Sequence, residues 1–118
     1  MAETAKADVE RFLADFHVKR KIYEVYFRDE RGVNTRAMLE LEISHARRLE
    51  IVESLCVEDF SHGPLDDKLY GIASMWVFGR TFKKKEIYIK ISLGPVNANA
   101  ICISFHKAER ALSYPFKS

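Results

Sequence analysis

The strongest constraint on the fold is the alternation of apolar and polar residues from Glu86 to Ser92, which reads EIYIKIS. Ile87, Ile89 and Ile91 occupy every second position, and side chains of a β-strand alternate between its two faces. The pattern therefore predicts a strand with one apolar face against a core and one polar face. It is typical of an antiparallel sheet covered on one side only.

Two further strand-like segments flank this one, MWVFGR before it and AICISFH after it. The connections are short: a basic turn at Lys83 to Lys85, and the turn-rich GPVNAN. Short turns between consecutive strands predict an antiparallel meander.

The last strand also alternates. Its expected core-facing residues are Ile101, Ile103 and Phe105. Its expected outward-facing residues are Cys102, Ser104 and His106. Antiparallel pairing brings this outward set beside Tyr88 and Lys90. Trp76, Phe78 and Arg80 share one side of the preceding strand, and the pattern leaves open which face that is.

Helical spacing dominates the N-terminal half. Val9, Phe12, Leu13 and Phe16 follow the i, i+3, i+4, i+7 pattern, which predicts a helix with Asp8 as cap and an end near His17. Lys21 to Phe27 is rich in β-branched and aromatic residues and predicts a strand. Asn34 and Thr35 are expected to cap a second helix, which carries Met38, Leu39 and Leu41. Ser44 is expected to cap a third helix, on which Ile43, Leu49, Val52 and Leu55 share a side.

Phe60 to Gly71 has turn residues and no period, so it is expected to be a loop. Near the C-terminus, Pro115 disfavours a regular element, and Tyr114 and Phe116 are expected to pack back onto the body. With 118 residues, 47% of them hydrophobic, the chain fits a single domain, residues 1–118. The fold class expected from these elements is α+β, an antiparallel sheet with helices packed on one face.

Charge is distributed unevenly along the chain. Met1 to Phe60 holds 10 basic and 13 acidic residues, whereas Ser61 to Ser118 holds 9 basic and 4 acidic. A polyanionic partner would therefore bind through the second half. No apolar stretch approaches the roughly 18 residues that span a membrane, so no membrane partner is expected.

Cys56 and Cys102 lie in apolar contexts, which favours buried, reduced thiols and a cytoplasmic location. No metal or other cofactor is expected, because the histidines lack ligand spacing. The four histidines are His17, His45, His62 and His106.

The polar face of the predicted sheet suits a phosphodiester substrate. RNA is cleaved when its 2′-hydroxyl attacks the adjacent phosphate, which requires a proton acceptor, a proton donor and a cation. His106 titrates near neutral pH, Lys90 or Arg80 would supply the cation, and Tyr88 would donate a hydrogen bond or stack on a base. Lys84, in the basic turn, is either a phosphate contact or part of a solvated hairpin. The plain alternative is that this face is simply the solvated side of a sheet.

The stretches VEDFSHGP, WVFG, EIYIKI and AICISFHKAE, in this order and spacing, resemble the MqsR-type toxins of bacterial toxin-antitoxin modules. The similarity spans roughly Phe12 to Glu109. It implies a RelE-like fold and a metal-independent endoribonuclease that cleaves mRNA. It also implies a cognate antitoxin protein, usually encoded by the adjacent gene, which neutralises the toxin.

The resemblance also assigns roles to residues. The catalytic tyrosine of the family falls on Tyr88, the basic residue that follows SF in the last strand falls on His106, and a lysine of the DF loop falls on His62. The family's glutamine after the strand tryptophan falls on Val77, which has no polar group. We therefore expect His62, Tyr88 and His106 to be catalytic, and Arg80, Lys90 and Lys84 to bind the substrate. The competing hypothesis is a catalytically inactive, toxin-like module that binds RNA or protein.

Overall fold

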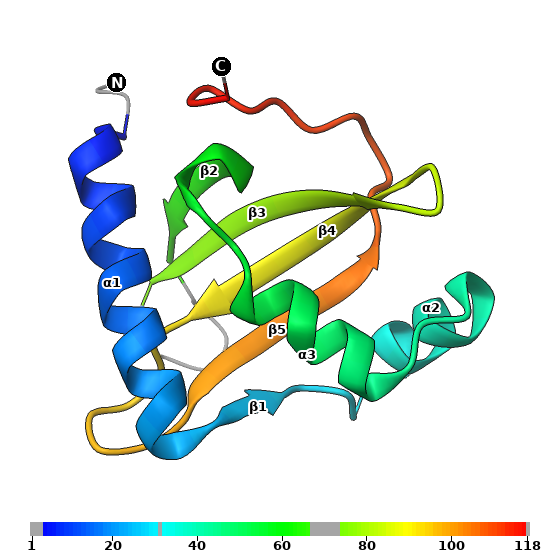
Figure 1. Cartoon of the computed structure of the whole chain (residues 1–118), viewed down its shortest axis with the longest axis horizontal. Coiled ribbons are helices and arrows are strands. Elements are labelled where there is room, and N and C mark those ends of the chain that lie inside the picture. Colours follow the sequence, from blue (N-terminus) through cyan, green and yellow to red (C-terminus); the bar gives the residue numbers. More distant parts are fainter. Residues whose placement is uncertain (1–3, 31, 67–73, 118) are drawn as a thin grey trace.

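The computed structural model describes residues 4–30, 32–66 and 74–117. These ranges contain three α-helices, one short 3-10 helix and five strands (Figure 1). Their order is α1 (Lys6–Tyr23), β1 (Val25–Phe27), α2 (Val33–Leu41), α3 (His45–Glu53), η1 (Val57–Asp59), β2 (Phe60–Leu65), β3 (Met75–Phe82), β4 (Lys85–Ser92) and β5 (Ala100–Lys107). The α+β class is confirmed. In these ranges no helix has both the length and the apolar character that crossing a membrane requires.

The five strands form one open sheet in the order β1-β5-β4-β3-β2. Strands β2 to β5 pair antiparallel with their sequence neighbours, so the predicted meander is confirmed. The short strand β1 instead pairs parallel with β5, with Tyr26 opposite Ile101. The sheet is therefore mostly antiparallel rather than wholly so.

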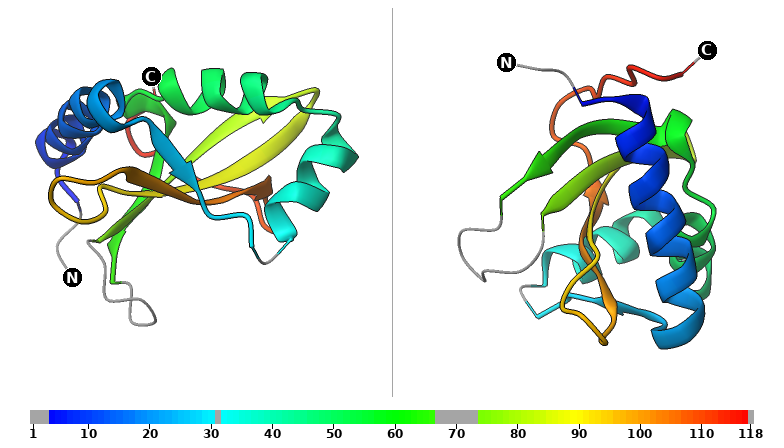
Figure 2. Two further views of the ribbon diagram at one scale, coloured as in Figure 1. Left: turned by 90° about the horizontal axis from the view of Figure 1, so that it is seen from below. Right: turned by 90° about the vertical axis from the view of Figure 1, so that its left-hand side faces the viewer.

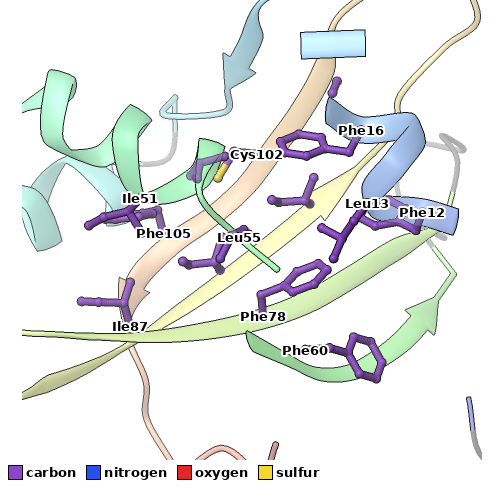
Figure 3. Packing of buried hydrophobic residues seen from close by; sticks show 14 of the residues in the cluster. Phe12, Leu13, Phe16, Ile51, Leu55, Phe60, Phe78, Ile87, Cys102 and Phe105 are labelled. Carbon is purple, nitrogen blue, oxygen red and sulfur yellow. The ribbon is translucent and has the colours of Figure 1, made fainter. Parts of the chain in front are cut away.

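Helices α1 and α3 lie over the same face of the sheet (Figure 2). Between them and the strands is the core, where Phe12, Leu13 and Phe16 of α1 face the strand residues (Figure 3). The ring of Phe12 stacks on Trp76 at 4.9 Å and on Phe78 at 5.9 Å. Trp76 and Phe78 therefore occupy the helix-covered face, which the sequence pattern had left open.

The alternation predicted for β4 is confirmed, because Ile87, Ile89 and Ile91 are fully buried in the core. The prediction for β5 is wrong over its first half. Lys90 pairs with Ser104 but Ile91 pairs with Cys102, so a bulge leaves Ile103 as an extra residue. A bulge inverts the alternation on one side of it. As a result Cys102 packs in the core cluster with the β4 isoleucines, whereas Ile101 is buried outside that cluster and Ile103 is only half-buried.

Helix α1 is longer than predicted. It continues past His17 to Tyr23, since the stretch VKRKIY holds no helix breaker, and Arg20 and Lys21 in its last turn favour the negative end of the helix dipole. The predicted strand from Lys21 shrinks accordingly to β1. Asp8 lies within the first turn and is not the cap; that position is Ala5, which makes no side-chain capping bond.

Of the two other predicted caps, one is confirmed. Ser44 begins α3, and its hydroxyl accepts a hydrogen bond from the Arg47 amide at 3.0 Å. The cap of α2 is Gly32, in the left-handed conformation, and not Asn34 or Thr35.

Asn34 has a different task. Its side chain donates to the Ile103 carbonyl at 3.1 Å and accepts from the Phe105 amide at 2.9 Å. Strand β1 ends opposite Cys102, so these β5 groups lie just past the last β1 pairing. The buried Asn34 amide thus takes the place of the next strand residue. These two hydrogen bonds hold α2 at the sheet edge instead of over the helix-covered face (Figure 2).

Two further expectations are wrong. Phe60 to Leu65 is the edge strand β2 and not a loop, because it pairs with β3 despite its irregular composition. Asp66 follows the strand, and residues 67–71 of the predicted loop lie outside the described residues. Cys102 is buried as expected, but Cys56 is exposed, with its thiol 3.4 Å from a carboxylate oxygen of Asp59.

The C-terminal residues do pack back onto the body. The Phe116 ring stacks on Phe60 at 5.7 Å, and the Tyr114 hydroxyl donates to Glu86 at 2.6 Å.

Candidate functional site

A pocket of about 700 Å³ lies on the sheet face opposite α1 and α3. Its floor is formed by β2, β4 and β5, through the side chains of His62, Tyr88, Lys90, Ser104 and His106. One wall comes from the end of β1 and the start of α2, and the other from the segment that follows β5. The sheet thus places the three predicted catalytic residues in one concavity.

Tyr88 and His106 are direct partners in the β4–β5 ladder. Their rings stack with centroids 5.3 Å apart and only 11° between the planes. The Nδ1 of His106 lies 3.1 Å from the Lys107 carbonyl oxygen, which can only accept a hydrogen bond. In the neutral ring Nδ1 therefore carries the proton, and Nε2 is left as the basic nitrogen.

His62 reaches the same pocket from the edge strand β2. Its ring lies 6.4 Å from that of Tyr88, on the side opposite His106 in the order of the strands. The Ser61 hydroxyl is 3.2 Å from His62 Nδ1 and orients the ring. Burial, and then the positive charge of Lys90, lower the pKa of His62 below its ordinary value. His62 therefore favours the neutral form, which accepts a proton.

Lys90 lies next to Tyr88 on the floor, with its Nζ 5.8 Å from the centre of the tyrosine ring. This geometry is that of a cation–π contact. Burial raises the pKa of the Tyr88 phenol, so the hydroxyl stays protonated and can donate a hydrogen bond near neutral pH. The floor thus offers one hydroxyl donor, one ammonium group and two imidazoles.

The bulge in β5 also shapes the pocket. It turns Ile103 toward the pocket, where its side chain adds an apolar patch beside Ser104. An apolar patch between polar groups suits the face of a nucleic acid base. Strict alternation hid this residue at the sequence level, because a bulge has no reliable sequence signal in a strand without glycine.

Sequence reasoning also missed the two walls. Arg28 and Val33 line the pocket on the β1 side, and Glu109 and Arg110 line it on the C-terminal side. The basic excess of the second half of the chain pointed toward Arg110. Nothing in the local pattern pointed to Arg28.

Two predicted substrate-binding residues are not brought to the pocket. Arg80 pairs with Ile87 in the ladder and so faces the helices, where it binds Asp59 at 2.7 Å and the Ser54 hydroxyl at 3.1 Å. Lys84 lies in the β3–β4 turn, in the left-handed conformation, and does not line the pocket.

Val77, the position of the family's glutamine, is fully buried opposite Lys90 and offers no polar group.

Across residues 4–30, 32–66 and 74–117, no three histidine, cysteine or acidic side chains are grouped closely enough to hold a metal ion. The side chains of the pocket can transfer protons, form hydrogen bonds and neutralise negative charge.

Comparisons of this chain with known protein families, with curated proteins and with solved structures find no match.

Proposed function

We propose that this protein is an endoribonuclease, and that the 2′-hydroxyl of the RNA attacks the adjacent phosphate in the cleavage step. One observation carries the proposal: His62 and His106 flank the Tyr88 ring, at 6.4 and 5.3 Å, on the floor of a pocket that also holds Lys90. Two imidazoles on either side of a hydrogen-bond donor match the needs of an in-line attack on a phosphodiester.

In the proposed reaction, His62 is the general base. Its lowered pKa leaves it neutral near pH 7, so it accepts the proton of the 2′-hydroxyl. The 2′-oxygen forms a bond to phosphorus, and the bond from phosphorus to the 5′-oxygen breaks. His106, as an imidazolium, gives its proton to that leaving oxygen. Tyr88 and Lys90 hold the phosphate oxygens, and the product ends in a 2′,3′-cyclic phosphate.

We further propose that the substrate is mRNA, that the fold is RelE-like, and that a cognate antitoxin neutralises the protein in the cell. The support is the resemblance to MqsR-type toxins in the order of segments. Those segments correspond to β2, β3, β4 and β5. Strands β2, β4 and β5 form the pocket floor, and β3 lies between β2 and β4 in the sheet. Growth arrest would follow from loss of mRNA.

A second function, binding without catalysis, is favoured by the residues that are not in the pocket. Val77 supplies no polar group where the family has a glutamine, and Arg80 is engaged by Asp59 on the other face. If the lack of this glutamine and the pairing of Arg80 with Asp59 remove catalysis, the pocket still binds an unpaired base and its phosphate.

The test is cleavage of purified mRNA and of a single-stranded RNA oligonucleotide by the wild-type chain, with EDTA present. The matched variants are His106→Ala, His62→Ala and Tyr88→Phe. We expect wild-type cleavage in EDTA and strong loss in each variant.

Expression in a bacterial host should give the same result in growth: arrest by the wild-type chain, and strong loss of that arrest in each variant. If the wild-type chain binds RNA but does not cleave it, the enzyme hypothesis fails and the binding function takes its place.

A further inference from the structure

The segment after β5 crosses the pocket face of the sheet. It passes over Gly79, which pairs with Tyr88 in the ladder and so points to the same face. A Cβ atom at Gly79 would collide with the Tyr114 hydroxyl and lie 2.7 Å from the Leu112 side chain. Glycine at this position therefore creates the space into which the segment docks.

Glu86 fastens the segment from the same face. One carboxylate oxygen accepts the Leu112 backbone N–H at 2.9 Å, and the other accepts the Tyr114 hydroxyl at 2.6 Å. The Glu86 carbonyl also accepts the Ala108 N–H at 2.8 Å. Three hydrogen bonds to one residue fix the course of the chain between Ala108 and Tyr114.

The part held in this way is the C-terminal wall of the pocket, residues 109–113. Arg110 on this wall is exposed, and among the described residues no ion pair engages it. Two residues of the floor of the same pocket, Lys90 and His106, also have basic side chains. Arg110 thus adds a cationic group to the wall, next to the acidic Glu109, beyond the basic groups of the floor.

Resting on the proposed function, we infer that residues 109–113 are a substrate-binding wall. In it Arg110 contacts the phosphate next to the one that is cleaved, and Glu86 is the positioning residue that holds the wall in place. The phosphate at the reacting centre lies on the floor, among the two imidazoles and Tyr88. A strand that continues past this point runs along the wall, where the Arg110 guanidinium meets its next phosphate.

This assignment predicts a difference between binding and chemistry. Arg110 does not touch the reacting atoms, so its loss should raise KM and leave kcat close to the wild-type value. A lost phosphate contact should also reduce the salt dependence of binding to single-stranded RNA, by about 0.7 in the slope of log K against log salt.

The experiment compares Arg110→Gln with Arg11→Gln, which removes the same charge from an exposed position on α1. The binding probe is a fluorescein-labelled, fully 2′-O-methylated single-stranded RNA, which binds but cannot react. Anisotropy titrations at several salt concentrations give the slope, and cleavage of the unmodified RNA gives KM and kcat. We expect about tenfold weaker binding for Arg110→Gln, as for loss of one hydrogen bond to a charged group. Arg11→Gln should bind like the wild type.

The role of Glu86 is tested with Glu86→Ala and the conservative Glu86→Gln. Glu86→Ala frees the wall, so KM should rise with kcat retained, and the Leu112 amide should lose protection against hydrogen exchange. Glu86→Gln keeps one acceptor oxygen for the Leu112 N–H and should restore part of both properties. A merely structural role would lower the apparent kcat through the folded fraction and leave KM unchanged.

Equal salt slopes and equal binding for Arg110→Gln and Arg11→Gln would overturn the inference, whether or not the wild-type chain cleaves RNA. If the wild type binds the methylated probe with an Arg110-dependent slope but cleaves nothing, the wall stands and the nuclease assignment fails. If it neither binds nor cleaves, both fail.

Discussion

The two faces of the sheet use the same strands for opposite purposes. On the helix-covered face, Ile87, Ile89 and Ile91 are fully buried, and the cation of that face, Arg80, binds Asp59 at 2.7 Å. On the pocket face, Tyr88 and Lys90 alternate with these isoleucines along β4, and the Tyr88 ring lies between the imidazole rings of His62 and His106. One face buries its side chains in a core, and the other presents polar side chains to a pocket.

The difference teaches that stability and the proposed activity are separable within a single strand. A substitution on the helix-covered face removes packing, whereas its neighbour one residue away changes the pocket alone. Four predictions test this separation, from the largest expected effect to the smallest.

The largest effect is expected for His106→Ala. Loss of a general acid should lower kcat for RNA cleavage by about 10²- to 10⁴-fold. The thermal midpoint should change little, because His106 lies half-buried on the pocket face and its ring packs on Tyr88 alone among aromatic groups of the described residues. Lys107→Gln, at the next and exposed position, is the matched control for activity. An unfolded His106→Ala protein would contradict the claim that pocket-face residues act on activity and not on stability.

Ile89→Ala should have the opposite signature. Truncating a fully buried isoleucine costs about 2–5 kcal/mol of unfolding free energy, through lost burial and the cavity that remains. Urea denaturation measures the loss. The fraction that remains folded should cleave RNA with the wild-type kcat. A tenfold lower kcat per folded molecule would contradict the separation.

Ile103→Ala tests the bulge. Because Ile103 lies half-buried in the pocket instead of the core, its truncation should cost only about 1 kcal/mol, a fraction of the value for Ile89. The same urea titration measures both. Equal losses of unfolding free energy for the two isoleucines would indicate that Ile103 packs in the core, which contradicts the bulge.

The smallest effect concerns the pH dependence of stability. The pKa of His62 is lower in the folded protein than its ordinary value of 6.5, so the unfolded chain takes up this proton first as pH falls. Stability should therefore decrease as pH falls from about 6.5 through the folded pKa. His62→Gln should flatten this part of the pH dependence, which is measured as the urea midpoint between pH 5 and 7.5. An unchanged slope would show that His62 has an ordinary pKa.

Regular patterns in the sequence predicted the parts of the molecule that depend on local periodicity. The alternation of β4 sets its two faces, and with antiparallel pairing it places Tyr88 beside His106 before any coordinates are known. The core residues of α1 follow in the same way from helical spacing.

The features that the patterns missed depend on distant contacts. The bulge at Ile103 arises where β5 must satisfy both β4 and the Asn34 side chain, which lies 69 residues away in sequence. Strand β2 has no regular alternation because its register with β3 shifts between Phe60 and His62, so that Phe60 enters the core and His62 enters the pocket although they are two residues apart. Only pairing with β3 makes it a strand.

The C-terminal wall left one signal that a sequence reading can use. A glycine inside an otherwise regular strand, here Gly79, often marks the close approach of another segment. Together with the expected return of Tyr114 and Phe116, it points to a tail that crosses β3. The partner in that contact, Glu86, has no sequence signature because an acidic residue next to a turn is ordinary.

The most direct test of the account is the chemical structure of the cleaved RNA ends. We predict that a single-stranded RNA incubated with the wild-type chain and EDTA yields a 2′,3′-cyclic phosphate, detected by ³¹P NMR. An oligonucleotide with one 2′-deoxy substitution at the cleavage site should stay intact, and His106→Ala should produce no cyclic ends above background. Cleavage of the deoxy-substituted strand, or full cleavage by His106→Ala, would contradict the claim that the Tyr88 pocket is an RNA-cleaving site.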